Sequence, residues 1–272
     1  IPQVSNAATY PARGRRLLRF PYQAIVMKTL DRTSSTIVRV ATIIGVGLFG
    51  IGSTERAHAT LIEKGPSKLS PYFMPGMLAN LAPGQVSMRY GFRGPNYALT
   101  SACASGAHAI ADAARLIRFG EVDAAVAGGA EAAVTPLGVG GFTALRALST
   151  RNEAPEEASR PFDRDRDGFV IGEGAGVLML EEYGAARKRG APILCEIVGS
   201  GASSDAHHLT QPSPDGNGAE RAIRAALDSA GIDGSEVDYV NAHGTSTLYG
   251  DRQEALAIAR VVRPGCLVSS TK

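Results

Sequence analysis

Hydrophobic residues follow two patterns along the chain, and the two patterns alternate. Short runs of small or β-branched apolar residues are typical of buried strands. Longer stretches in which apolar residues recur every three or four positions predict helices. The strands are expected at residues 36–44, 97–102, 123–127, 176–180, 193–200, 237–241 and 266–269. The helices are expected at residues 53–65, 74–88, 103–119, 218–230 and 251–262. Strands interleaved with helices of this length predict a layered α/β fold.

Glycines and small polar residues mark the ends of these elements. Ser53 or Thr54 is expected to be the N-cap of the first helix, and Gly65 is expected to end it. Gly120 closes the helix at 103–119. A helix ends and strand patterns begin again near Gly190, which predicts a boundary between two parts of the fold.

The composition fits a globular protein with closely packed backbones. Glycine accounts for 32 of the 272 residues, about 12%, against a usual share of about 7%. The net charge is +2, so no basic field indicates a nucleic-acid partner. A small arginine cluster is expected to lie on a solvated helix face, with a docking patch for an acidic partner as the alternative. Its members are Arg13, Arg15, Arg16 and Arg19.

Two further classes of protein are excluded by what the sequence lacks. No stretch approaches the roughly 20 uncharged apolar residues of a membrane span, and residues 1–12 do not read as a secretory signal. Cys103, Cys195 and Cys266 are widely spaced and form no CxxC pair. They argue against a disulfide framework or a zinc site and favour a reducing compartment.

Three motifs imitate ligand sites without meeting their full requirements. Gly45–Gly50 has the GxGxxG spacing of a dinucleotide loop, but Glu63 falls inside a predicted helix instead of at the end of the next strand. A tight turn without a nucleotide is expected there. Asp163–Gly168 resembles the start of a calcium loop, yet Gly174 stands where a bidentate Glu is needed. An aspartate-rich turn paired with its interleaved arginines is expected, and no metal site. His208, with His207 before it, is expected to pack in a loop or to line a substrate channel.

The stretch from Thr100 to Gly106 carries the first candidate for chemistry. Cys103 lies where an apolar strand turns into a helix, among residues too small to cover it. The unpaired amides and the dipole at a helix N-terminus stabilise a thiolate, and the same amides can hold a developing oxyanion. A nucleophile for acyl transfer and a small buried structural cysteine are about equally supported by this spacing.

The stretch from Asn241 to Thr247 carries the second candidate. His243 directly follows a predicted strand, at the kind of position where α/β sites gather. Taken alone, a histidine satisfied by neighbouring loop hydroxyls is as well supported. Beside a candidate cysteine nucleophile, a catalytic histidine becomes the better interpretation. Cys195 and Cys266 are interpreted as structural.

These two motifs together resemble the β-ketoacyl-[acyl-carrier-protein] synthases, the condensing enzymes of fatty acid synthesis, and most closely the type II enzyme of bacteria and organelles. The resemblance is strong over residues 43–272 and loose before them. Further segments agree with the family in its own order, at residues 63–66, 128–131, 135–138, 146–152, 160–163, 166–169 and 268–272.

The resemblance implies a thiolase-like fold in which two similar halves stack in five αβαβα layers, normally as a homodimer. Residues 1–190 would form the N-terminal half, with Cys103, and residues 191–272 an incomplete C-terminal half, with His243 and Lys272. The family's second catalytic histidine and its glycine–phenylalanine gate lie beyond the lysine. A C-terminal part is therefore expected to be missing or truncated.

The resemblance also implies a role for each matching residue. Cys103 would carry the acyl chain as a thioester, His243 would stabilise the enolate of the malonyl unit, and Lys272 would order the site electrostatically. Thr245 and Thr247 would bind the phosphopantetheine arm of acyl-carrier protein, so that no other cofactor is needed. The positions that would line the acyl pocket or its entrance are Leu48, Phe142, Phe169 and His208.

The implied activity is decarboxylative condensation of malonyl-carrier protein with a Cys-bound acyl chain, in the cytosol or an organelle matrix. Neither nucleic acid nor membrane is an expected partner. A polyketide ketosynthase shares every residue named above, and a catalytically incomplete fragment or scaffold is a third interpretation. A chain-length factor would lack the cysteine, and a dinucleotide-dependent enzyme is the least supported interpretation.

Overall fold

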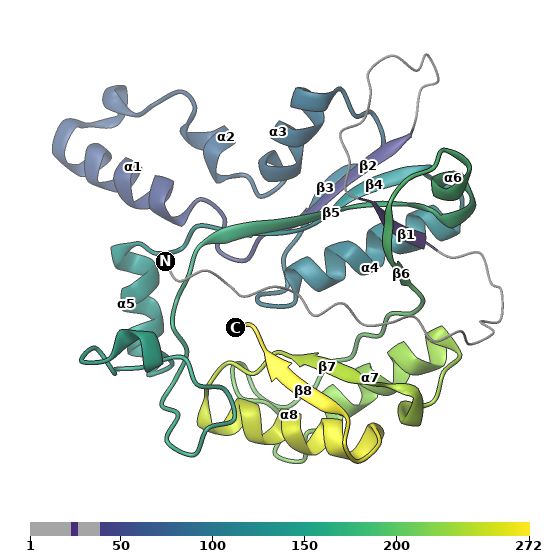
Figure 1. Cartoon of the computed structure of the whole chain (residues 1–272). Coiled ribbons are helices and arrows are strands. Elements are labelled where there is room, and N and C mark those ends of the chain that lie inside the picture. The colour runs from purple at the N-terminus through teal and green to yellow at the C-terminus, as the bar shows by residue number, and fades with distance from the viewer. Residues whose placement is uncertain (1–22, 27–38) are drawn as a thin grey trace.

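A six-stranded mixed sheet forms the centre of the larger part of the molecule (Figure 1). The computed structural model describes residues 23–26 and 39–272, so the predicted arginine-rich helix face lies outside the described residues. The strand order is β3 (Asn96–Leu99), β2 (Val40–Gly45), β4 (Ala124–Glu131), β5 (Gly174–Glu182), β1 (Gln23–Val26) and β6 (Ile193–Ile197). Strands β3, β2 and β4 run parallel, whereas β5, β1 and β6 pair antiparallel with their neighbours.

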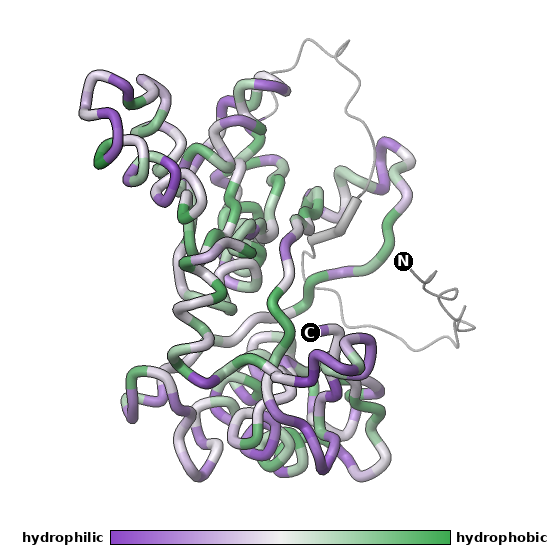
Figure 2. The backbone as a smooth tube through the Cα atoms, turned by 90° about the vertical axis from the view of Figure 1, so that its left-hand side faces the viewer, coloured by the Kyte–Doolittle hydropathy of each residue, from purple (hydrophilic) through white to green (hydrophobic). Residues whose placement is uncertain are grey.

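Helix α4 (Ser105–Arg118) packs on this sheet and supplies most of the core. Every residue of β2 is buried, and the segment is rich in β-branched residues, as expected for a strand. Ala109 and Ala113 of α4 are fully buried near Ile43 and Leu180 in one hydrophobic cluster. Their small side chains let the helix axis approach the strands closely. Figure 2 shows hydrophobic residues running through this central region and hydrophilic residues on many outer turns.

Helix α3 (Leu81–Tyr90) packs against β2 and β3, and α1 (Ile51–Lys64) and α2 (Phe73–Met77) precede it in the chain. Figure 1 shows α3 above the β2–β3 edge and α4 below it. The prediction of one helix over 74–88 is wrong. Leu78 adopts an extended conformation with ψ of 122°, and it separates α2 from α3. The periodicity continues across the break, so hydrophobic spacing alone does not reveal it.

The start of α1 also differs from the prediction. The helix begins at Ile51 after Gly50, which has a left-handed φ of 70°, and neither Ser53 nor Thr54 is its N-cap. The Thr54 hydroxyl instead donates to the Gly50 carbonyl within the first turn. Gly50 turns the chain here beside α2, where a Cβ would lie 2.9 Å from the Met77 Cα. The predicted end at Gly65 is confirmed.

A second unit contains a two-stranded parallel sheet, β7 (Tyr239–Ala242) and β8 (Leu267–Ser270). Helices α7 (Asn217–Ala230) and α8 (Leu248–Val261) belong to this unit, which Figure 1 shows below α4. Its core joins Ala242, Ile258 and Val262.

Two short helices and one strand refine the prediction further. Helix α5 (Pro136–Ala144) follows β4 after a short loop, and α6 (Tyr183–Lys188) follows β5 directly. The first four residues of β5 are exposed, and of the predicted run at 176–180 only Leu180 is fully buried. The prediction of a buried strand is therefore wrong for most of that run. Among the described helices, none is long and apolar enough to cross a membrane.

Candidate active site

Glycine contacts press the N-terminus of α4 onto the sheet. A Cβ on Gly45, at the end of β2, would lie 2.2 Å from the backbone carbonyl carbon of Ser105. A Cβ on Gly129 of β4 would lie 3.3 Å from the Gly106 Cα. Three backbones meet here, and at Gly45 the distance is one that only glycine allows. The glycine excess of the sequence therefore has a direct structural use at this point.

A strained turn between β3 and α4 presents Cys103. Ala102 has a left-handed φ of 51°, which is uncommon for a residue with a Cβ. Ser105 holds the turn, because its Oγ accepts the Ser101 N–H at 2.9 Å and donates to the Ala102 carbonyl at 2.6 Å. The helix begins at Ser105, two residues later than predicted, and leaves Cys103 exposed at the tip of the turn.

Cys103 lies together with two residues from the second unit. A hydrogen bond with the His243 side chain holds the pKa of the Cys103 thiol below its ordinary value. Desolvation opposes this shift, while the positive charge of Lys272 adds to it. A lowered thiol pKa means more thiolate at neutral pH, and the thiolate is the nucleophilic form. The geometry therefore suits a nucleophilic cysteine.

The backbone at His243 is fixed by a carboxylate that the sequence analysis did not single out. His243 directly follows β7, as predicted. Its N–H donates to Glu254 Oε1, and the Gly244 N–H donates to Glu254 Oε2, both at 2.7 Å. The Ser270 hydroxyl, at the end of β8, donates to the carbonyl oxygens of both residues. The only sequence signal for Glu254 is its place on a helix that follows the histidine.

Lys272 is positioned by two serines. Its N–H donates to Ser270 Oγ at 3.1 Å, and its carbonyl accepts the Ser159 hydroxyl at 2.9 Å. Ser270 thus contacts both the histidine loop and the lysine backbone. The parallel register of β7 and β8 brings these two strand ends to one edge of the small sheet.

Thr245 and Thr247 lie side by side, with their hydroxyl oxygens 2.9 Å apart. Between them, Ser246 is fully buried with a left-handed φ of 67°. Its hydroxyl accepts the Arg160 N–H at 3.1 Å. The loop therefore turns its serine inward.

A buried ion pair anchors the charged segment at 146–167 to α8, the helix that follows this loop. The Asp251 side chain is 1% exposed and lies 3.3 Å from the Arg166 guanidinium. Asp251 also accepts the Phe162 N–H at 2.7 Å, and Arg166 donates to the carbonyl oxygens of Thr247 and Leu248.

The prediction that neighbouring aspartates pair with all the interleaved arginines is therefore wrong for Arg166. It is correct for the pair Arg164–Asp165. Helix α8 brings Asp251 into the segment, which local sequence spacing does not show. No group of three or more possible metal ligands occurs in the part of the chain that the structure describes.

The glycine loop at Gly45–Gly50 has its amides occupied by protein. The N–H groups of Gly47 and Leu48 both donate to Glu131 Oε2, at 2.9 and 2.7 Å. These are the groups that a dinucleotide phosphate would need. Leu48 itself is 39% exposed.

Of the remaining predicted pocket residues, two are in contact. The rings of Phe142 and Phe169 meet edge to face, with centroids 5.2 Å apart. His208 is held within its own loop, where its Nδ1 accepts the N–H groups of Thr210 and Gln211.

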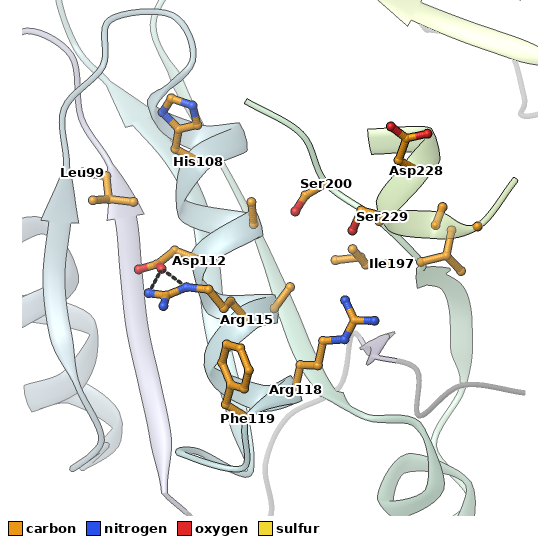
Figure 3. A pocket seen from close by; sticks show the side chains of 16 residues that line it. Leu99, His108, Asp112, Arg115, Arg118, Phe119, Ile197, Ser200, Asp228 and Ser229 are labelled. Carbon is orange, nitrogen blue, oxygen red and sulfur yellow. Dashed lines mark hydrogen bonds and ion pairs between the residues drawn. The ribbon is translucent and has the colours of Figure 1, made fainter. Parts of the chain in front are cut away.

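A cavity of about 780 Å³ lies farther along α4. Figure 3 shows His108, Arg115 and Arg118 of α4 on one side and Ile197, Ser200 and Asp228 on the other. Cys103, His243 and Lys272 are not among its lining residues. The cavity is therefore separate from the cluster around the thiol.

Comparison with protein families matches both parts of the chain. Residues 13–186 match the model of the beta-ketoacyl synthase N-terminal domain, and residues 194–272 match that of the C-terminal domain. The 3-oxoacyl-[acyl-carrier-protein] synthase 2 of Vibrio cholerae is 50% identical over 92% of this chain and 61% of its own length. The mitochondrial 3-oxoacyl-[acyl-carrier-protein] synthase of Arabidopsis thaliana is 54% identical over 82% of this chain and 49% of its own length.

Solved structures with the same fold include ketosynthases of two kinds. A type II polyketide ketosynthase in complex with its acyl-carrier protein superimposes with a TM-score of 0.85 at 34% identity. That match covers 89% of this chain and 62% of the other. A beta-ketoacyl synthase from Burkholderia phymatum matches with a TM-score of 0.79 at 38% identity, over 88% of this chain and 59% of the other. The chain thus spans about 61% of the length of its first curated relatives.

Proposed function

The chain belongs to the β-ketoacyl synthase family, and from that premise we propose that its protein is a 3-oxoacyl-[acyl-carrier-protein] synthase of fatty acid elongation. The fold is the thiolase-like α/β fold of ketosynthases. The observation that carries the proposal is the thiol of Cys103, exposed before α4, hydrogen-bonded to His243 and close to Lys272. This arrangement suits a cysteine that attacks a thioester.

The first step in the proposed reaction loads the enzyme. The Cys103 thiolate attacks the carbonyl carbon of an acyl chain held on the phosphopantetheine of acyl-carrier protein. The carbon–sulfur bond to phosphopantetheine breaks as the new thioester forms. The released phosphopantetheine sulfur takes up a proton. The lowered pKa of Cys103 supports this step because it raises the fraction of the attacking sulfur that is ionised.

The second step forms the carbon–carbon bond. Malonyl-carrier protein loses carbon dioxide, and the electron pair of the broken bond becomes an enolate. The enolate carbon attacks the acyl carbonyl on Cys103, and the cysteine sulfur leaves as a thiolate. His243 donates a hydrogen bond to the thioester oxygen where negative charge develops, and Lys272 adds positive charge nearby. The product is a 3-oxoacyl chain two carbons longer.

The remaining family positions are proposed to guide the substrates. Thr245 and Thr247, whose hydroxyls lie together, would bind the phosphopantetheine arm. The acyl chain would pass residues of the pocket and its entrance, namely Leu48, Phe142, Phe169 and His208. No metal or nucleotide takes part in this scheme. The N–H groups of Gly47 and Leu48 already donate to Glu131, which supports the proposal that this loop forms a wall of the acyl pocket and not a phosphate-binding site.

A polyketide ketosynthase is the second candidate, because a matching solved structure is a type II polyketide ketosynthase bound to its acyl-carrier protein. The curated relatives, at 50% identity, carry the 3-oxoacyl synthase name, whereas that ketosynthase is 34% identical. This difference favours fatty acid elongation. Product analysis separates the two, since one condensation followed by release differs from repeated condensation on one chain.

We also propose acyl-carrier protein as partner and a homodimer as the assembly, with residues 1–190 and 191–272 as the two related parts. In the described residues, β3 lies at an edge of the large sheet and pairs with β2 alone. Exposed Met88 and Tyr90 of α3 lie on the helix that packs against this edge. A second copy of the chain would extend the sheet at β3. Sedimentation of the full-length protein tests whether a dimer forms. A compartment with reduced thiols, the cytosol or an organelle matrix, fits the activity.

The test uses the full-length protein with acyl- and malonyl-carrier protein. Wild type is expected to form a 3-oxoacyl product, and peptide mapping after iodoacetamide is expected to place the label on Cys103. Cys103→Ser should lose both the label and the product. Cys195→Ser serves as the matched control and should lose neither. Labelling confined to Cys195 or Cys266 would overturn the proposal, as would a Cys103→Ser enzyme that still condenses.

A further inference from the structure

A carboxylate at the end of one strand holds the loop that follows the neighbouring strand. Strands β2 and β4 pair in parallel, with Gly45 opposite Gly129. β4 continues two residues farther, to Glu131, whose half-buried side chain reaches across to the loop after β2. Glu131 Oε2 accepts the N–H groups of both Gly47 and Leu48. One oxygen atom therefore fixes two consecutive peptide units.

The same loop lies against the turn that presents Cys103. The Val46 N–H donates to the Leu99 carbonyl, and the Thr100 hydroxyl donates to the Val46 carbonyl. A Cβ on Gly47 would lie 3.8 Å from the Ala102 carbonyl oxygen and 2.8 Å from Glu131 Oε2. Val46 is hydrogen-bonded to Leu99 and Thr100, whereas the N–H groups of the next two residues, Gly47 and Leu48, donate to Glu131. Leu48 is thus held next to the site by a carboxylate and not by strand pairing.

We propose that Glu131 is a positioning residue that sets the acyl chain-length preference of the Cys103 site by fixing the place of Leu48. The proposal rests on the proposed function, because it assumes that an acyl chain is carried on Cys103 beside this wall. Leu48 is 39% exposed, so packing alone holds it weakly. Removing Glu131 leaves two backbone donors without their acceptor and releases the loop.

A loose wall discriminates poorly between chains of different length. A well-formed apolar pocket separates substrates that differ by one methylene by roughly tenfold or more. That separation requires a wall that stays in place when a longer chain presses on it. The expected effect of losing Glu131 is therefore on the ratio of rates for two acyl lengths, more than on the overall rate.

The variants follow from the contact geometry. Glu131→Ala removes the acceptor. Glu131→Gln keeps one carbonyl oxygen that can accept both the Gly47 and Leu48 amides, and it sacrifices only the longer contact to the Ala132 N–H at 3.3 Å. Glu173→Ala is the matched control, since Glu173 also accepts one backbone amide, that of Val134 at 2.8 Å, in a nearby loop.

The experiment measures kcat/KM of the full-length enzyme for the two acyl-carrier proteins that wild type separates most strongly. In Glu131→Ala, the ratio of the two kcat/KM values is expected to move toward one by about fivefold or more. In Glu131→Gln and Glu173→Ala, this ratio is expected to stay within about twofold of the wild-type ratio. Hydrogen exchange supplies a second readout, in which the amides of residues 46–51 exchange faster in Glu131→Ala alone.

The two levels of failure are distinguishable. A wild-type enzyme that takes no acyl chain on Cys103 contradicts the proposed function. An active wild type whose ratio is unchanged in Glu131→Ala, with both rates lowered equally, overturns the positioning role. If Glu131→Ala does not fold, Glu131→Gln and Glu131→Asp decide. The aspartate is one methylene too short to reach the loop, so an unchanged ratio in the aspartate variant also overturns it.

Discussion

Asp251→Ala is expected to destabilise the second unit by about 3 kcal/mol, far more than an ordinary surface change. Asp251 is 1% exposed and accepts the Phe162 N–H, which would become an unsatisfied donor. An unsatisfied buried donor costs about 1–3 kcal/mol. Breaking a buried ion pair from one side costs about 3–5 kcal/mol. The Arg166 side chain is 13% exposed and keeps its contacts to carbonyl oxygens, so the lower end of that range applies.

The assay is urea denaturation followed by circular dichroism, with the free energy of unfolding taken for the transition that includes α8. The matched control is Asp238→Ala, because Asp238 pairs with Arg263 at 2.6 Å but is 89% exposed. That exposed pair is expected to contribute less than about 1 kcal/mol. A double-mutant cycle with Arg166→Met isolates the coupling between the two charges. Equal effects for Asp251→Ala and Asp238→Ala would refute the reasoning that burial, and not the ion pair itself, sets the magnitude.

Two further predictions concern the thiol and the glycine contact. Because the hydrogen bond from His243 and the charge of Lys272 lower the pKa of Cys103, the thiolate persists to lower pH in wild type than in His243→Ala. The midpoint of the profile of iodoacetamide alkylation rate against pH should therefore lie at higher pH in the variant than in wild type. Superimposable pH profiles would contradict this. Gly45→Ala would place a methyl group 2.2 Å from the Ser105 backbone, so it should lose about 3 kcal/mol or fail to fold. Gly140→Ala, on α5 with no neighbour within 4 Å, should be neutral or stabilising by up to about 1 kcal/mol in thermal denaturation.

The local pattern of the sequence predicted the elements well, because periodicity and glycine report on each element alone. Helix α4 and the buried strands β2 and β4 lie within a few residues of their predicted ranges. The errors fall where the deciding contact is distant in sequence. Gly50 is the N-cap of α1 and lies beside Met77, a contact that is not visible in the local sequence.

Part of the candidate site could be predicted from the sequence for the same reason. Cys103 and His243 each follow a strand, and that is a local feature. Their meeting depends on how the second unit packs on the first, so the pairing came from the family resemblance and not from spacing. Glu131 and Glu254 act on residues 83 and 11 positions away, respectively. Their function as acceptors is therefore invisible in the pattern of the chain.

The carboxylates around the thiol follow from the glycine content of the site. Loops rich in glycine let backbones approach closely, but they carry few side chains that could hold them by packing. Two loops of the site have an acidic acceptor for their amides, namely Glu131 at Gly47 and Glu254 at Gly244. A carboxylate can accept several N–H groups at once, so one side chain fixes two peptide units. The short loops that surround Cys103 are consequently held by acceptors on β4 and α8, and a change to either acidic residue should disturb the site without touching a substrate.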